Sequence, residues 1–294
     1  MVPHRTLGGI SALELLKRTA RESWDDEVFG HSARLAFYHF LAIFPALLIV
    51  LIPLTRLASH GSAMERMLTG SFDQVLPRQS AALVVSTIAD LEKNAHAGGL
   101  VLAIGGLGAA WAAMNASLAM ITGLNRAYET DEDRGWMRVS LIAAGLAITV
   151  IALVFGTLVA LHYASIVFGG ATGPARTAVQ WTSVVSILTV SFALFYRFAP
   201  NLQVHKWTWS LPGAGAAALL WTGATILLRV WFDELSSYDQ IYGRVAPAAI
   251  LLLWLYLTSA AVMIGAELNS EIEKAREAAG GEGRLRTSAR EDSV

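Results

Sequence analysis

The segment "VAPAAILLLWLYLTSAAVMIGAELN", Val245–Asn269, decides the fold class of this 294-residue chain. From Val245 to Ala266 it contains no Asp, Glu, Lys or Arg. A helix needs about 20 apolar residues to cross the roughly 30 Å hydrocarbon core of a bilayer. Backbone groups in lipid must find partners within their own segment, so such a run forms a helix. The segment is therefore predicted to be a transmembrane helix that ends near a single carboxylate, Glu267.

Working outward, the same pattern recurs along the chain. Five further charge-free windows are Leu35–Thr55, Asn94–Asn125, Val139–Ala175, Thr177–Tyr196 and Trp207–Leu228. The composition agrees, since 54% of the residues are hydrophobic and 15% are charged, against about 25% charged in a typical soluble domain. We predict an all-α integral membrane protein with six transmembrane helices near residues 35–57, 99–123, 139–167, 176–198, 208–231 and 245–268.

The basic residues give the orientation. Six spans place both termini on one side of the membrane, and fifteen of the 22 Lys and Arg residues fall in segments on that side. Because basic residues favour the inner side, both termini are predicted to be cytoplasmic. The membrane domain then covers residues 34–270.

Three segments lie outside the spans. In the cytoplasmic segment 1–33, Leu13, Leu16, Ala20 and Trp24 recur at steps of three and four, which predicts an amphipathic helix along the inner membrane surface. Between the first two spans, the pattern "SAALVVSTIADLEKN" predicts a helical outer loop, packed on the bundle rather than lying in the interface. The charged tail 271–294 is predicted to be an exposed helix end followed by disorder.

Polar residues at the cytoplasmic ends of the spans form the main candidate site. Glu267 is the most informative, because an ionisable group near apolar sequence needs a partner. Arg34, Arg126 and Arg197 lie at comparable predicted depth. Such a pair would either lock the bundle or serve as an inner gate or a headgroup-binding site. The whole predicted cluster is Arg34, Asn125, Arg126, Arg197, Asn201, Glu267 and Asn269.

Two polar residues fall deeper. Asn115 near the middle of the second span is predicted to bond to another helix, an interaction worth about 1 kcal/mol in lipid. His39 in the first span is either a hydrogen-bonded structural residue, the interpretation we prefer, or a proton-coupling group.

The last outer loop, "SSYDQIYGRVA", Ser236–Ala246, contains turn chemistry. Ser236 and Asp239 have the spacing of a capping box, and Gly243 is placed to end the turn. Tyr238 and Tyr242 lie four apart and suit the membrane interface. We predict a capped helical turn that fixes the entry of the last span. An outer lid is the functional alternative.

Catalytic signatures are missing from the sequence. There is no cysteine, the seven histidines do not form HExxH or another metal-pair spacing, and no nucleotide or nucleophile motif occurs. The acidic groups at residues 25–27 and 131–133 read as solvated surface. The net charge of -1 gives no reason to expect a nucleic-acid partner. We therefore predict no enzymatic activity, no metal and no cofactor.

Several of these motifs together resemble the YihY/BrkB family of membrane proteins over about residues 13–273. They are "RLAFYHFLAIFP", "GLNRAYE", "YRFAPN", "LPGA", "SSYDQIYG" and the end of the opening segment. The first motif departs from the family at His39 and Ala42. The resemblance implies a six-span protein of the bacterial inner membrane. Members have been labelled ribonuclease BN or virulence factor, and transport of a lipid-like or small solute is the usual suggestion.

These observations favour a transporter or flippase-like protein, with membrane lipids as its surroundings and the cytoplasmic cluster as its gate. The alternative is a structural or envelope-assembly protein in which the same residues only fix the packing. A ribonuclease is the least favoured, because the sequence lacks a two-metal carboxylate cluster. The sequence fixes neither the substrate nor the oligomeric state.

Overall fold

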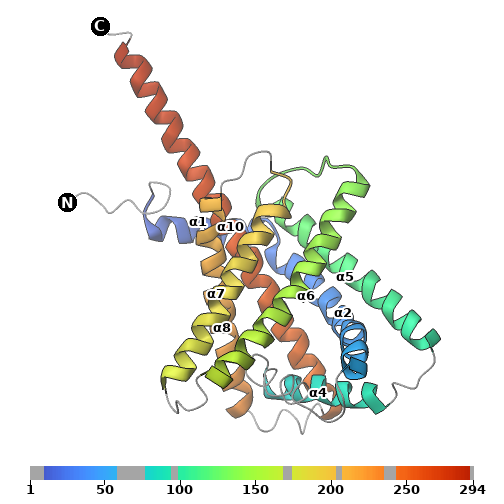
Figure 1. The fold of residues 1–294 in the computed structure, drawn as a ribbon. Helices are drawn as coiled ribbons and strands as arrows, with labels where there is room; N and C mark the ends of the chain where they lie inside the picture. Colours follow the sequence, from blue (N-terminus) through green and yellow to red (C-terminus); the bar gives the residue numbers. More distant parts are fainter. Residues whose placement is uncertain are drawn as a thin grey trace.

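The computed structural model describes residues 10–57, 77–93, 99–167, 174–202, 207–234 and 243–291, and its ribbon is shown in Figure 1. Within these ranges every regular element is a helix. They are α1 (Ala12–Asp25), α2 (Val28–Leu57), α4 (Arg78–Lys93), α5 (Gly99–Ala127), α6 (Trp136–Val167), α7 (Pro174–Phe198), α8 (Trp207–Glu234), the short 3-10 helix η2 (Gly243–Val245) and α10 (Ala246–Glu291).

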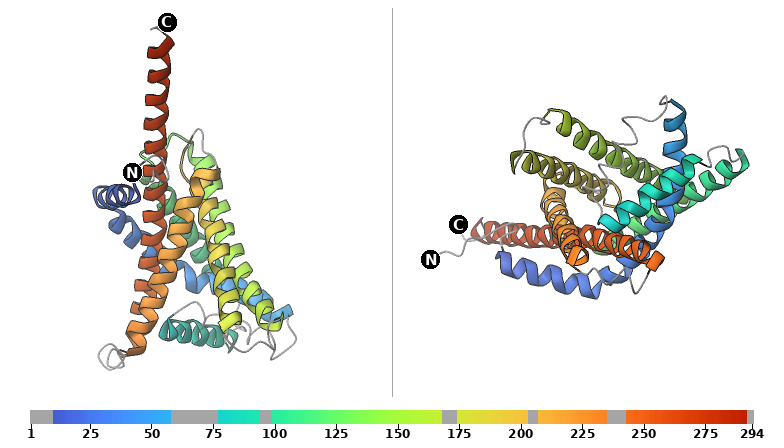
Figure 2. Two further views of the ribbon diagram at one scale, coloured as in Figure 1. Left: turned by 90° about the vertical axis from the view of Figure 1, so that its left-hand side faces the viewer. Right: turned by 90° about the horizontal axis from the view of Figure 1, so that it is seen from below.

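The long helices α2, α5, α6, α7, α8 and α10 form one bundle, and consecutive members run in opposite directions (Figures 1 and 2). α1 and the C-terminal part of α10 lie at one end of the bundle, and α4 lies across the other end. Among the described residues, four stretches are long and apolar enough to cross a membrane: Ala103–Ala127, Trp181–Phe198, Ser210–Phe232 and Ala246–Ala278. A crossing by all six helices stays a prediction.

The outer faces of the bundle carry large apolar side chains. Leu107 is 73% exposed, Leu219 is 67% exposed and Ile148 is 66% exposed. In water, apolar surface on this scale would favour association or aggregation. In a bilayer it is the surface that contacts lipid.

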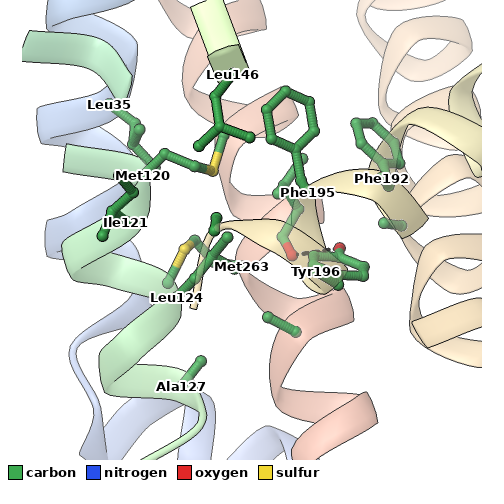
Figure 3. Close-up of a cluster of buried hydrophobic side chains, with 14 of the residues drawn as sticks. Leu35, Met120, Ile121, Leu124, Ala127, Leu146, Phe192, Phe195, Tyr196 and Met263 are labelled. Carbon is green, nitrogen blue, oxygen red and sulfur yellow. Dashed lines mark hydrogen bonds between the residues drawn. The ribbon is translucent and has the colours of Figure 1, made fainter. Parts of the chain in front are cut away.

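The core forms where several long helices meet. Figure 3 shows Leu35, Met120, Leu124, Tyr196 and Met263 packed together, side chains contributed by α2, α5, α7 and α10. Tyr196 is fully buried, and its hydroxyl donates to the carbonyl oxygen of Val262 at 2.6 Å. Because a buried hydroxyl without a partner is costly, this bond fixes α7 against α10.

Helices α8 and α10 approach most closely at two glycines. A Cβ atom on Gly265 would lie 2.6 Å from the carbonyl oxygen of Gly213 and 2.8 Å from the Cβ of Ala217. Both distances are far below ordinary van der Waals contact, so neither helix has room for a side chain here. Small residues at the crossing let the two backbones touch.

Two helices, α2 and α10, extend beyond the spans predicted from hydropathy. α2 begins at Val28, before the predicted span at residue 35, because Val28 and Ser32 are fully buried and the helix has already entered the core. α10 continues to Glu291, through the segment for which we predicted a helix end followed by disorder. Hydropathy locates the lipid, whereas backbone hydrogen bonds determine where a helix ends.

α4 falls inside the loop for which we predicted an amphipathic helix. Ala81 and Val84 of α4 are buried in a small core with Leu251 and Leu255 of α10. Ala81 and Val84 therefore pack on protein, in agreement with the prediction of packing on the bundle.

Candidate functional site

The asparagine junction, named here for Asn125 and Asn201, joins the end of α5 to the end of α7. The backbone N–H of Asn201 donates to Oδ1 of Asn125 at 2.8 Å. The Nδ2 group of Asn125 donates to Glu132 Oε2 at 2.9 Å. Asn125 is buried, and both ends of its amide are paired. The motifs "GLNRAYE" and "YRFAPN", which are far apart in sequence, are therefore held together by one side chain.

The loop after α5 completes this junction. Thr130 Oγ1 donates to the carbonyl oxygen of Asn201 at 3.1 Å, and Arg134 Nη2 donates to that of Ala199 at 2.9 Å. Asn201 Nδ2 in turn donates to the carbonyl oxygen of Asp131 at 2.9 Å and to the carboxylate of Asp133. The loop is thus tied to the end of α7 from both sides.

Glu132 is part of the same network. Arg134 Nε donates to Glu132 Oε1 at 2.6 Å, and this bond holds the pKa of Glu132 below its usual value. The acidic stretch 131–133 was predicted to be simple solvated surface. Glu132 is exposed, as predicted, but its carboxylate also accepts a hydrogen bond from Asn125.

Asn269 has an equivalent role at the crossing of α8 and α10. Its Oδ1 accepts from the backbone N–H of Gly213 at 2.7 Å, and its Nδ2 donates to the carbonyl oxygen of Ser210 at 3.1 Å. Pro212 lies inside α8 and has no N–H of its own, which loosens the regular bonding of that turn. The amide of Asn269 therefore supplies from α10 the partners that this turn of α8 needs, joining "LPGA" to "GAELN".

Glu267 lies half a helical turn before Asn269 and has the opposite environment. It is 1% exposed, and neither carboxylate oxygen has a hydrogen-bond partner among the described residues. We expected an ion pair with Arg34, Arg126 or Arg197, and the described residues show none. Arg126 instead binds Asp26, with 3.0 Å between Nε and Oδ1, while Arg34 is exposed and Arg197 is half-buried.

The nearest basic side chain along α10 is Lys274. It binds Glu129 at 2.7 Å and Glu271 at 2.9 Å. Glu271 is 4% exposed and pairs with Lys274 within α10, whereas the more exposed pair of Lys274 with Glu129 ties α10 to the end of α5. Between α5 and α10 lies Tyr128. Burial raises the pKa of Tyr128 above its usual range, and the side chain of Asn269 opposes this shift.

An open pocket of about 630 Å³ lies beside these groups, between the end of α5, the start of α2 and the loop after α5. Its ionisable lining residues are mostly acidic, with Arg126 and His31 as the basic members. Burial, with the charge of Arg34, holds the pKa of His31 below its usual value. The lining residues are Asp26, His31, Leu118, Ile121, Thr122, Asn125, Arg126, Glu129, Thr130, Asp131, Glu132 and Val139.

The two deeper polar residues, Asn115 and His39, form hydrogen bonds within their own helices. The Nδ2 group of Asn115 donates to the carbonyl oxygen of Trp111, one turn earlier in α5, at 2.7 Å. The predicted bond from Asn115 to another helix is not found among the described residues and stays a prediction. His39 is half-buried and bonds to the backbone of Leu35 in α2.

Of the outer-loop prediction, only Gly243 can be placed. It has a φ of +50°, in the left-handed region that glycine adopts without strain, and it opens the short helix η2 just before α10. The other four residues, Ser236, Tyr238, Asp239 and Tyr242, lie outside the described residues.

Sequence analysis missed two features of this region. Asp26 was assigned to solvated surface, yet its side chain is only 12% exposed and lines the pocket. Thr19 and Ser23 are 4% exposed on the face of α1 opposite the predicted apolar stripe. Leu15, Thr19 and Ser23 recur every four residues, and this spacing was the signal available in the sequence.

The described residues contain no group of three or more His, Cys, Asp or Glu side chains that could hold a metal ion.

Comparison with known proteins identifies relatives of this chain. The chain is 28% identical to the ribonuclease-like protein YfkH of Bacillus subtilis, over 83% of this chain and 89% of that protein. It is 23% identical to a UPF0761 membrane protein of Rhodospirillum centenum, over 90% of this chain and 59% of the relative. A UPF0761 membrane protein of Chromohalobacter salexigens is 26% identical, over 84% of this chain and 60% of the relative. The chain thus spans less than two thirds of the two UPF0761 proteins.

No solved structure matches the chain. The family model described as "Virulence factor BrkB" matches residues 19–290, which covers every motif that carried the resemblance from α2 to the end of α10. The printed names of the UPF0761 relatives identify them as membrane proteins, in agreement with the apolar helices of this chain. The chain therefore belongs to the BrkB family.

Proposed function

We propose that this BrkB-family membrane protein is a six-span protein of the bacterial inner membrane, with both termini in the cytoplasm. The excess of basic residues in the predicted inner segments supports this orientation. The placement of α1 and the C-terminal part of α10 at one end of the bundle supports it as well. The apolar stripe of α1 supports a position at the inner membrane surface, because Leu13, Leu16 and Trp24 are 61–74% exposed.

Its proposed activity is transport, or movement between leaflets, of a lipid-like or small solute. The open pocket of about 630 Å³ is the observation that carries this proposal. Its volume is in the range of small-molecule sites. The lining changes from charged groups such as Asp26 and Glu129 to apolar ones such as Leu118 and Ile121. A solute with a polar head and an apolar part fits such a gradient. The acidic majority favours a cationic or neutral head.

Flux through proteoliposomes tests this proposal, with a blocking variant and a matched control. Thr122 lines the pocket and is exposed, and among the described residues its hydroxyl bonds to its own helix, at Leu118. Thr149 in α6 has the same kind of bond, to Gly145, and is not part of the pocket lining. We expect Thr122→Trp to abolish flux and Thr149→Trp to retain it.

The assay follows the movement of fluorescent phospholipids with zwitterionic and anionic heads, and the uptake of a small amine. Equal flux in the two tryptophan variants would contradict a role for the pocket. Wild-type flux no greater than that of empty vesicles, for all three probes, would contradict transport itself.

The second candidate is a structural or envelope-assembly protein. Asn125, Asn201 and Asn269 favour it, because their side-chain groups are taken up by contacts between helices. Normal membrane abundance together with absent flux would support this role. We propose no enzymatic activity, no cofactor and no nucleic-acid partner. Purified protein should accordingly leave RNA intact with or without added Mg²⁺ or Mn²⁺.

A further inference from the structure

The interface between α1 and α10 contains buried polar groups that the bundle does not satisfy. α1 packs along α10 through Leu15, Thr19 and Ser23, one residue per turn. Thr19 and Ser23 are each 4% exposed, and neither hydroxyl oxygen has a hydrogen-bond partner among the described residues. A buried hydroxyl that loses water without gaining a partner costs about 1–3 kcal/mol. Two in one interface therefore suggest a ligand.

Glu267 faces the same interface from α10. The groups that act on it electrostatically include Glu22 of α1 and Asp26, the residue that follows α1. Both carboxylate oxygens lack partners, although the residue is 99% inaccessible. An isolated ionised carboxylate in such a place is among the most costly groups that a protein can bury. Pairing with a cation would remove this cost.

The surrounding charges do not supply one. Glu22 and Asp26 of α1 and Glu271 of α10 add negative charge around Glu267, and Lys274 is the basic group that opposes it. Lys274 is already held by Glu129 and Glu271, and Asp26 by Arg126. From the end of α5, Tyr128 also lies within electrostatic range of Glu267. The net potential at the carboxylate is negative and attracts a positive ion.

A proton is the simplest cation that neutralises this carboxylate. A carboxylic acid has one O–H donor and keeps acceptor capacity, and each hydroxyl can both donate and accept. A metal ion would need several more oxygen ligands than one carboxylate and two hydroxyls. Among the described residues, no three or more His, Cys, Asp or Glu side chains lie together in a way that could hold a metal ion.

We propose that Glu267 is a proton-binding site at the α1–α10 interface, reached from the open pocket through Asp26. Asp26 belongs to both places, because it lines the pocket and acts on Glu267. Proton binding follows from the side chains alone. Its use to drive movement of a solute rests on the proposed function.

Infrared spectroscopy tests the binding step without any flux. Wild-type protein in lipid nanodiscs is exchanged between H₂O and D₂O at neutral pH, and the carbonyl band of a protonated carboxylic acid is followed. We expect one such band that is lost in Glu267→Gln. The band should survive in the double variant Thr19→Ala with Ser23→Ala, because these hydroxyls are not hydrogen-bonded to the carboxyl group. Glu271→Gln is the matched control and should keep the band, since Glu271 is paired with Lys274.

Three outcomes would overturn the proposal. They are a band that survives in Glu267→Gln, a band that is lost in Glu271→Gln, and the absence of any band in wild type together with stabilisation by Na⁺ that Glu267→Gln abolishes. The last result would identify a sodium site instead. Monodispersity on size-exclusion chromatography confirms that each variant is folded. If binding is found but proteoliposomes show no flux, the site stands and only its coupling role fails.

Discussion

Asn269 and Glu267 lie two residues apart on α10, and both are 1% exposed. Asn269 has its oxygen and nitrogen paired with the backbone of α8, whereas neither oxygen of Glu267 has a partner among the described residues. The two positions face different neighbours, because successive residues of a helix point in different directions. Burial alone therefore does not reveal function. A satisfied polar group fixes packing, and an unsatisfied one indicates a site.

The largest effect is expected at the satisfied side of this comparison, for Gly213→Ala. The added Cβ would lie 2.5 Å from Cγ and 2.6 Å from Nδ2 of Asn269 and would collide with the carbonyl oxygen of Gly265. Separating α8 from α10 should lower the unfolding free energy by about 4 kcal/mol. Denaturant or thermal unfolding in detergent measures it. Gly215→Ala is the control, since nothing lies within 4 Å of a Cβ there. A similar loss in both variants would refute the crossing as the cause.

Asn269→Ala should have the next largest effect. It leaves the N–H of Gly213 and the carbonyl of Ser210 without their side-chain partner, a loss of about 3 kcal/mol for the two groups. Asn115→Ala removes an amide that bonds only within α5, so we expect a change below about 1 kcal/mol there. The same unfolding assay compares them. Equal losses would mean that the contact between helices contributes nothing.

A smaller, pH-dependent effect is expected at the asparagine junction. The hydrogen bond from Arg134 lowers the pKa of Glu132 in the folded protein. Its stabilising contribution is therefore full above the ordinary value of 4.5 and is lost as the pH falls below it. The difference between wild type and Glu132→Gln should be below about 1 kcal/mol at neutral pH, since Glu132 is partly solvated, and should shrink in acid. A difference that stays constant with pH would contradict this assignment.

The smallest effect on stability is expected for Glu267→Gln. If the carboxyl group already carries a proton, a neutral amide of the same shape replaces a neutral acid. The unfolding midpoint should then stay close to that of wild type at neutral pH, in contrast to Asn269→Ala. A large loss would show that Glu267 is a packing residue like Asn269 and would remove the difference between the two positions.

Much of the fold could be predicted because its signal is local. Charge-free windows located the six long helices, with boundaries usually within a few residues, since lipid excludes charge wherever a helix crosses it. The period of the stripe Leu13, Leu16, Ala20 and Trp24 likewise gave α1 and its exposed face. The motifs also pointed to the family that the comparison then showed.

The site was only partly predictable. Asn125, Asn201 and Asn269 were singled out, but no pattern in the sequence pairs them with Glu132, the α5–α6 loop or Gly213. Arg126 was assigned to Glu267 by depth alone, and the turn between α1 and α2, where Glu27 has a φ of +53°, brings Asp26 to it instead. Ion pairs depend on a few ångströms, which hydropathy does not resolve.

By itself, then, the sequence determined that this chain is helical, apolar and built of segments long enough to cross a membrane, because these properties depend on residue types within one helical segment. The tertiary structure alone decided which polar groups are satisfied. It placed Asn269 against the broken turn of α8 and left Glu267 buried with no hydrogen-bond partner among the described residues. The physical reason is that a hydrogen bond is decided by the distance and direction between atoms on different helices, and neither is encoded at any single position of the chain.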